Sequence, residues 1–354
     1  LISVPAFPHK PVLAMEIASD SLLLVGVDGQ GIWEVNPYSM EILNVHMEDP
    51  DNSRSLRGNG VYDIFNDGGG RVWVCTFTGG ASYFVQLPSS VQHFEHHVNE
   101  TNSLVNNDVN DILEDSRANL WLGTNNGISR WLKSENRWQS FYHSNNEEAH
   151  VFLSLCEDAQ GNIWAGTYGG GVFLIDGKSG REIAHYPLQS SKSGYHNSYI
   201  YDIFLDSKDR IWLVGVRGNV LCYDFETGNF IDFGNHPVNV IRELPSGDML
   251  LGCSYGVSVL NQETKNVNIL LNGYLVQDVL VQDSIFWLCT VGDGLVRFDS
   301  SSKTTQSFST DMGLPSAFVN SILVYEDSFW LGTENGLCKF DPLTYKVETF
   351  PAID

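Results

Sequence analysis

The sequence has few basic residues. Lysine and arginine together number 20 against 43 aspartates and glutamates, so the formal net charge is −23 at pH 7. This excess would repel a polyanion, and there is no basic stripe that could bind nucleic acid. Because a large net charge also keeps a protein soluble, the acidity by itself predicts no particular function.

Long apolar runs and helical patterns are also missing. No stretch approaches the roughly eighteen consecutive apolar residues of a membrane-spanning helix, so we expect no membrane contact by this segment itself. No apolar stripe with the i, i+3, i+4, i+7 spacing continues over about ten residues. The fold is therefore predicted to be all-β.

The signatures of common enzymes and metal sites are absent as well. The sequence has no G-x-S-x-G, P-loop or H-E-x-x-H pattern. His93, His96 and His97 are close in sequence, but neighbours on a strand point to opposite faces, so a shared metal ion is not expected. The six cysteines fall in different parts of the chain at positions that look buried, which predicts apolar core residues rather than disulfides. We therefore expect no catalytic residue, metal or cofactor.

What the sequence does contain is internal repetition. A tryptophan followed by small residues recurs at intervals of roughly forty residues, which indicates one supersecondary unit copied along the chain. The anchor tryptophans are Trp73, Trp121, Trp164, Trp212, Trp287 and Trp330, with Leu23 and Leu250 in the equivalent place of two weaker copies.

Each copy has the pattern of four short strands. In residues 107–142, runs of β-forming residues are separated by clusters of Asn, Asp, Gly and Ser. Such runs predict strands A to D joined by hairpins. One small sheet is not stable alone, but several arranged radially bury their faces against each other, as in a β-propeller.

We expect a single β-propeller domain over residues 1–354, built from four-stranded antiparallel blades. Eight blades are preferred, and a seven-bladed ring with one extra unit is the alternative. The predicted units are 11–48, 60–97, 107–143, 150–187, 199–234, 236–271, 275–309 and 317–351.

Several units carry a specific resemblance to a known repeat. Residues 99–115 read NETNSLVNNDVNDILED, with an N-S-L-x-x-N lead-in followed by V-x-x-I-x-x-D, and residues 161–171 read GNIWAGTYGGG, with the W-x-G-T pattern. Residues 312–322 have the comparable G-L-x-x-x-x-V-x-x-I lead-in. These patterns resemble the regulator-propeller repeat of hybrid two-component systems, which are periplasmic glycan sensors of gut bacteria. The similarity covers nearly the whole chain.

In that family two propellers precede a further β domain, a membrane helix, a kinase and a response regulator. The resemblance therefore implies that this chain is a non-catalytic part of a sensor. It implies a periplasmic location within a receptor anchored in the inner membrane. It also implies an oligosaccharide ligand and a homodimer in the intact receptor.

Comparison of the repeats separates residues that build a blade from residues that are free to bind a ligand. A small acid or hydroxyl recurs on strand A, which predicts a structural hydrogen bond to a neighbouring blade rather than a catalytic base. These residues are Asp63, Asp111, Ser154, Asp202, Asp278 and Ser321. The anchor tryptophan recurs too and is predicted to fill the space between sheets.

The turns between strands B and C differ from unit to unit. Because strand direction alternates, these turns and the D–A links between blades are expected on one face. The ligand-binding candidates on this face are Asp28, Arg57, Phe77, Asn126, Tyr168, His196, Arg217, Tyr255, Asp293 and Glu334. One arc would be aromatic and cationic and the opposite arc acidic, a combination that suits a sugar. Ordinary solvated turns are the alternative for any single residue.

Two other functions stay open. A carbohydrate-active hydrolase or lyase would need two facing carboxylates about 5–10 Å apart, which Asp28, Asp293 and Glu334 could supply. A general acid, however, needs a raised pKa, and a solvated turn does not provide the burial that raises it. A protein-interaction propeller would expose apolar residues on this face, whereas these turns are mostly polar.

Overall fold

The protein is described from a computed structural model. The structure describes residues 10–350, except residues 20 and 217 and the segments 52–54, 68–70, 86–93, 98–99, 144–149 and 189–198. The chain divides into two compact units, unit 1 (Leu1–Ser103) and unit 2 (Leu104–Asp354). In the described part of the chain, no helical segment has the length and hydropathy of a membrane span.

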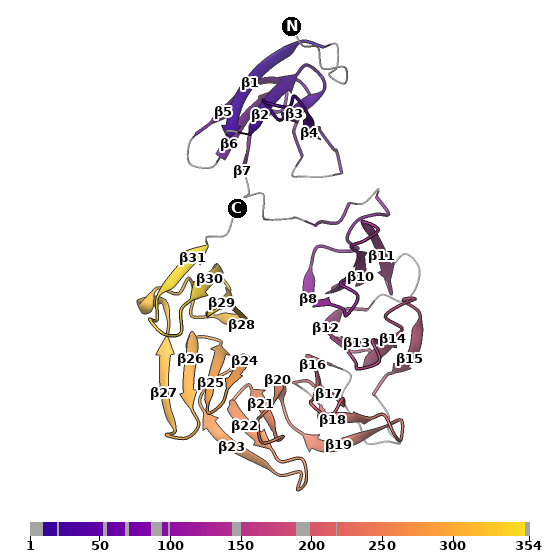
Figure 1. Ribbon diagram of the computed structural model, residues 1–354, viewed down its shortest axis with the longest axis vertical. Helices are drawn as coiled ribbons and strands as arrows, with labels where there is room; N and C mark the ends of the chain where they lie inside the picture. Colours follow the sequence, from indigo (N-terminus) through magenta and orange to yellow (C-terminus); the bar gives the residue numbers. More distant parts are fainter. Residues whose placement is uncertain are drawn as a thin grey trace. The chain divides into compact units, whose positions relative to one another are not determined.

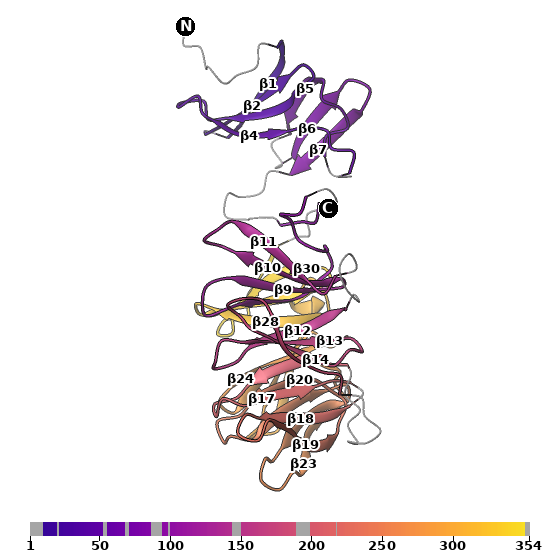
Figure 2. The ribbon, with the colours of Figure 1, turned by 90° about the vertical axis from the view of Figure 1, so that its right-hand side faces the viewer.

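Unit 1 contains two antiparallel sheets in its described part. Its strands are β1 (Val12–Ser19), β2 (Leu22–Val27), β3 (Gly31–Val35), β4 (Ile42–His46), β5 (Val61–Asn66), β6 (Arg71–Thr76) and β7 (Gly80–Val85). Sheet 1 consists of β1–β4 and sheet 2 of β5–β7. The fourth strand predicted for sheet 2 would fall in residues 86–93, outside the described residues. Within this unit the two sheets pack face to face around a core that includes Leu24, Val61 and Val74 (Figure 2).

Unit 2 contains six four-stranded antiparallel sheets, each with its strands in chain order. Sheet 3 consists of β8 (Val109–Glu114), β9 (Leu120–Thr124), β10 (Gly127–Leu132) and β11 (Arg137–Phe141). Sheet 4 consists of β12 (Phe152–Glu157), β13 (Ile163–Thr167), β14 (Val172–Ile175) and β15 (Glu182–Tyr186). Sheet 5 consists of β16 (Asp202–Leu205), β17 (Ile211–Val214), β18 (Asn219–Asp224) and β19 (Asn229–Asn235). Sheet 6 consists of β20 (Val238–Glu243), β21 (Met249–Cys253), β22 (Gly256–Leu260) and β23 (Val267–Asn272). Sheet 7 consists of β24 (Val276–Gln282), β25 (Ile285–Thr290), β26 (Leu295–Asp299) and β27 (Thr304–Phe308). Sheet 8 consists of β28 (Val319–Tyr325), β29 (Ser328–Thr333), β30 (Gly336–Phe340) and β31 (Val347–Phe350). One short 3-10 helix, η1 (Thr310–Met312), precedes sheet 8.

The eight sheets coincide with the eight predicted repeat units, so the all-β propeller fold is confirmed. Inside unit 2, the first strands of the sheets follow one another around the inner side of the arrangement (Figure 1). Neighbouring first strands are in contact along the whole series from β8 to β28. Closure of all eight sheets into one ring stays a prediction.

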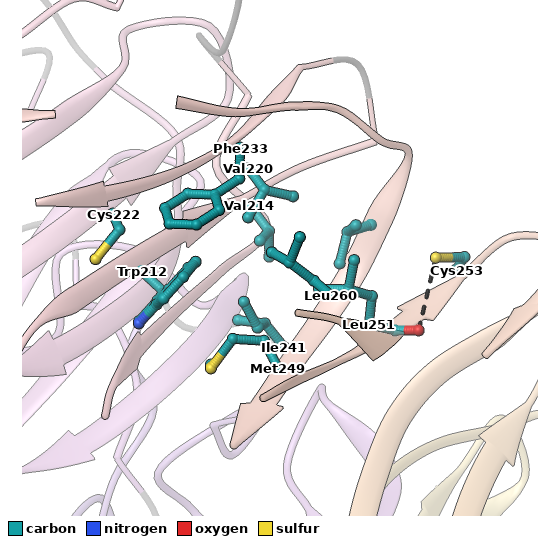
Figure 3. Packing of buried hydrophobic residues seen from close by; sticks show 11 residues of the cluster. Trp212, Val214, Val220, Cys222, Phe233, Ile241, Met249, Leu251, Cys253 and Leu260 are labelled. Atoms are coloured by element: carbon teal, nitrogen blue, oxygen red, sulfur yellow. Dashed lines mark hydrogen bonds between the residues drawn. The ribbon is translucent and has the colours of Figure 1, made fainter. Parts of the chain in front are cut away.

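Four anchor tryptophans, Trp121, Trp164, Trp212 and Trp287, pack against the following sheet. Trp121 of sheet 3 shares a buried cluster with Phe152 and Ile163 of sheet 4. Figure 3 shows the same arrangement two repeats further on, where Trp212 of sheet 5 lies with Ile241 and other side chains of sheet 6. Burial of a large side chain contributes up to about 3 kcal/mol, so each buried tryptophan helps to hold neighbouring blades together.

The indole N–H of Trp121, Trp164 and Trp212 donates to an aspartate six residues earlier, in the turn between strands A and B, whereas that of Trp287 donates to Gln282 Oε1. Trp212 Nε1 donates to Asp206 Oδ2 at 2.8 Å, and Trp121 Nε1 donates to Asp115 Oδ2 at 2.9 Å. Burial alone would raise the pKa of Asp115, but the hydrogen bonds from Asn119 and Trp121 hold it below its usual range. The turn aspartate therefore offsets the desolvation cost of burying the polar indole, since an N–H left without an acceptor inside the core would destabilise the fold.

The glycine and threonine of the W-x-G-T-x-x-G pattern shape the turn between strands B and C. Gly166 lies so close to sheet 5 that a Cβ there would be 2.5 Å from Ile200 Cγ2. Thr167 Oγ1 donates to the carbonyl of Gly171 at 2.8 Å, and Gly171 has a φ of +82°. A larger residue at either glycine would clash, which explains the residue types in this part of the repeat.

Two anchor tryptophans are not buried like the others. Trp73 of sheet 2 is 37% exposed and its ring contacts that of Tyr83 at a tilt, and Trp330 of sheet 8 is half-buried and stacks on Phe350. Cys75 lies two residues after Trp73 on β6, on the same side of the strand. Its side chain is exposed, so the prediction that it is buried is wrong. The six cysteines are all free thiols. No described sheet of unit 1 follows sheet 2, which is why its tryptophan side has no cover within that unit.

Candidate functional site

The B–C turns and the D–A links lie together at one end of each blade, as predicted. In sheet 4 the amide of Tyr168 donates to the carbonyl of Val151 at 2.9 Å, and in sheet 8 the amide of Glu334 donates to Phe318 at 3.1 Å. The acceptors are link residues that lead into strand A. This end of the inner strands is therefore lined by turn and link residues from successive blades.

A β-bulge recurs at the same place on the inner strands. The pairing of strands A and B skips one residue near the start of strand A, for instance between Val109 and Asp111, between Val276 and Asp278, and between Val319 and Ser321. A bulge bends the strand and re-aims the extra side chain, and such bulges are common next to binding sites. We call the skipped residues of unit 2 the bulge residues. They are Asn110, Leu153, Asn239, Gln277 and Asn320.

The bulge residues are mostly side-chain amides. Asn110 Nδ2 donates to Phe152 O in the next sheet at 2.9 Å and to Asn125 Oδ1 in its own B–C turn at 3.0 Å. Asn239 Nδ2 likewise donates to Val276 O of the next sheet at 2.7 Å. These bonds place Asn110 beside both its B–C turn and the following blade, and Asn239 beside the following blade, so the bulge residues lie along the inner border of the candidate site.

Two bulge residues are exposed, and their side chains have no hydrogen-bond partner within the described part of the protein. They are Gln277 of sheet 7 and Asn320 of sheet 8, which stand on adjacent inner strands. An amide offers two donor hydrogens and one acceptor oxygen. Both groups are therefore free to bond a ligand.

The turn candidates of unit 2 differ in their environment. Tyr168 is 57% exposed and its ring meets the ring of Tyr199 edge-on at 4.8 Å, which presents a paired aromatic surface at the start of sheet 5. Asp293 and Glu334 are exposed in the turns of sheets 7 and 8. All three are exposed, and their role as ligand residues stays a prediction.

Tyr255 and Asn126 are less accessible. Tyr255 packs against the core between sheets 5 and 6, its hydroxyl lies 3.4 Å from Ser258 Oγ, and burial raises its pKa. Asn126 is half-buried, and its backbone amide donates to Thr124 Oγ1 at 3.1 Å. Both stay predictions as ligand residues, although only part of each side chain faces solvent.

Three candidates lie in unit 1, and two fall outside the described residues. Asp28 and Arg57 are exposed, and Phe77 is 65% exposed with its ring 5.8 Å from Tyr62. The residues outside the described part of the chain are His196 and Arg217. The predicted cationic arc therefore stays a prediction.

The recurring acid of strand A forms the predicted bond to the next blade. The carboxylate of Asp111 accepts from the amide of Leu155 at 2.7 Å, and that of Asp202 accepts from Ile241 at 2.9 Å. Burial raises the pKa of Asp111 to about 6. These acids join blades, which confirms their structural assignment.

Sheet 6 lacks both the acid and the tryptophan of the repeat, and a charged group takes their place. Arg242 pairs with Leu250, donates to Asp202 of sheet 5 at 2.7 Å, and donates to Asp278 of sheet 7 at 2.8 Å. The arginine thus ties together three sheets. The sequence offered no pattern for this contact, because its partners are about forty residues away on either side.

The bulge residues were missed at the sequence level. In the sequence, most bulge residues stand between the apolar residue and the small acid or hydroxyl of strand A, as Asn110 does in Val109-Asn110-Asp111. The position varies between repeats while its neighbours recur, which is the mark of a residue that is free to bind. A bulge cannot be read from the pattern alone, because an unbroken strand would turn this side chain to the other face.

Comparison with known proteins identifies the repeat. Residues 103–126 and 147–169 match the family model described as "Two component regulator propeller". The chain therefore carries regulator-propeller repeats, as its sequence predicted, and it is a protein of the propeller class. No curated protein matches the chain.

Two solved structures share this fold. The extracellular domain of the putative hybrid two-component system BT4673 from B. thetaiotaomicron has a TM-score of 0.61 and 20% identity, covering 98% of this chain and 49% of its own. The computationally designed protein Ika8 has a TM-score of 0.52 and 15% identity, covering 98% of this chain and 97% of its own. The chain thus spans about half the length of the bacterial domain that it matches.

Proposed function

We propose that this chain is a non-catalytic, extracytoplasmic ligand-sensing segment of a hybrid two-component regulator and that its ligand is an oligosaccharide. The support for the sensor role is the regulator-propeller match at two repeats, together with a fold likeness over 98% of the chain to the extracellular domain of a putative hybrid two-component system. The parent receptor would be a histidine kinase that is anchored in the inner membrane, is dimeric and carries this segment in the periplasm.

The observation that carries the oligosaccharide proposal is the end of the blades where B–C turns, links and bulge residues meet. The exposed ring of Tyr168, which meets the half-buried ring of Tyr199, can stack on the apolar face of a pyranose ring. Carboxylates and amides such as Glu334 and Asn320 bond its hydroxyl groups. These side chains differ from blade to blade, whereas the groups that hold the blades together recur.

Isothermal titration calorimetry of the chain against a panel of plant and host oligosaccharides tests the proposal. We expect saturable binding of at least one oligosaccharide, and about tenfold weaker binding by Tyr168→Ala because stacking on the exposed ring is lost. Tyr38→Ala is the matched control, since Tyr38 is 81% exposed and belongs to the turn that follows strand C of sheet 1.

Two results would contradict the proposal. Folded protein, judged by its circular dichroism, that binds nothing in the panel would remove the oligosaccharide as ligand. Release of shorter sugars from a polysaccharide, lost in Glu334→Gln, would instead favour the hydrolase alternative.

A further inference from the structure

The bulge residues of unit 2 specify more about the ligand than its class, and this inference rests on the proposed function. We propose that they recognise an uncharged oligosaccharide, with Gln277 and Asn320 as the residues that bond its hydroxyl groups. The observation is that these two exposed amides, on adjacent inner strands, have no hydrogen-bond partner in the described part of the protein.

The chemistry of the amide favours neutral hydroxyl groups. A sugar hydroxyl both donates and accepts, and an amide offers both functions at one end of a side chain. Gln277 and Asn320 occupy equivalent positions of sheets 7 and 8, and the first strands of these sheets, β24 and β28, are in contact. Two such groups on neighbouring strands suit adjacent hydroxyls of one sugar or hydroxyls of successive sugars.

The charge of the site argues against an anionic sugar. The B–C turns of sheets 7 and 8, which carry Gln277 and Asn320, contain the carboxylates Asp293 and Glu334 and no lysine or arginine among their described residues, and the cationic candidate Arg217 belongs to the repeat of sheet 5. A uronate or sulfate group would meet like charge there. The chain as a whole carries −23, so the long-range field acts in the same direction.

Structural use of the neighbouring amides also separates their roles. The side-chain amides of Asn110 and Asn239 donate hydrogen bonds to backbone carbonyls of the next sheet. Their replacement would disturb the contact between blades, and they are therefore unsuitable for testing recognition. Gln277 and Asn320 have no such bond and can be changed without loss of a described hydrogen bond.

The test compares two groups of probes by calorimetry on the full chain at low ionic strength. The neutral probes are xylo-, manno- and β-1,4-galacto-oligosaccharides, and the anionic probes are oligogalacturonides and chondroitin sulfate oligosaccharides. We expect a neutral probe to bind at least tenfold more tightly than any anionic probe. We expect the double variant Gln277→Ala/Asn320→Ala to bind that neutral probe about tenfold more weakly. Asn268→Ala is the control, because Asn268 is an exposed amide on β23, an outer strand.

Each outcome decides a different claim. Equal or tighter binding of an anionic probe overturns the inference but leaves the oligosaccharide-sensing proposal in place. Unchanged affinity in a double variant that keeps the wild-type melting temperature also overturns it. No binding in either group overturns the proposed function, and the inference with it.

Discussion

Removal of the charge of Arg242 should destabilise unit 2 more than removal of any arginine without an ion pair. The guanidinium lies between two carboxylates, with N–O distances of 2.7 Å to Asp202 and 2.8 Å to Asp278. The three side chains have exposures of 31%, 20% and 17%, so water can replace the arginine only in part. The variant Arg242→Met keeps an apolar stem of similar reach and removes only the charge and its hydrogen bonds.

The expected cost follows from leaving two carboxylates without their partner. Loss of one member of a buried ion pair costs about 3–5 kcal/mol, and the partial exposure of this triad places the expected value at the lower end, about 3 kcal/mol. For a domain of this size, that corresponds to a fall of about 6 °C or more in melting temperature. Arg297→Met is the matched control, because Arg297 is half-buried in the next sheet and forms no ion pair with a described residue.

Thermal unfolding followed by circular dichroism measures the difference, and its pH dependence gives a second check. Burial raises the pKa of Asp202 above its unfolded value, so the folded protein binds more protons than the unfolded chain. Stability in the methionine variant should therefore recover as the pH is lowered through the raised pKa of Asp202, since protonation removes one of the two unpaired charges. A variant as stable as the wild type, or one that loses no more than Arg297→Met, would refute this account of the triad.

Further predictions concern the repeat itself. Asp206→Ala should cost about 1–3 kcal/mol in chemical unfolding because it leaves the indole N–H of Trp212 buried without an acceptor, and the same variant in a Trp212→Phe background should cost less. The carboxyl carbon of Asp111 should titrate near pH 6 by NMR, and a midpoint near 4 would contradict the burial that raises its pKa to about 6. Because the folded-state pKa is raised, ionisation of Asp111 should lower stability as the pH rises through 6. Cys75 should react first with a thiol reagent in the native state, and equal reaction of the five other cysteines would contradict their burial or partial burial.

Much of the fold was predictable because its signals are local. The tryptophan recurs in six of the eight repeats, and the turn aspartate six residues earlier or the glycine-threonine step accompanies it in several of them. The pattern identified eight sheets and assigned the recurring acids of strand A, represented by Asp111, to a structural bond that the structure contains. Recurrence was sufficient, because a group that holds one blade to the next is needed at every junction.

The candidate site was predictable in outline only. Alternation of strand direction correctly placed the B–C turns with the D–A links, and it therefore located Tyr168 and Glu334 at the same end of their blades. It did not reveal the bulge that re-aims Gln277 and Asn320, since a bulge depends on how two strands pair. The turn of Tyr255 toward the core was also beyond the pattern, because it depends on space left by a neighbouring sheet.

The sequence by itself determined the repeating sheet, its tryptophan core and the end of the blades at which variable residues gather, because these follow from strand periodicity and turn chemistry over a few residues. Only the tertiary structure decided that Arg242 joins three sheets and that Trp73 and Cys75 are exposed. Those outcomes depend on which side chains from different repeats meet, and a linear pattern carries no record of such contacts.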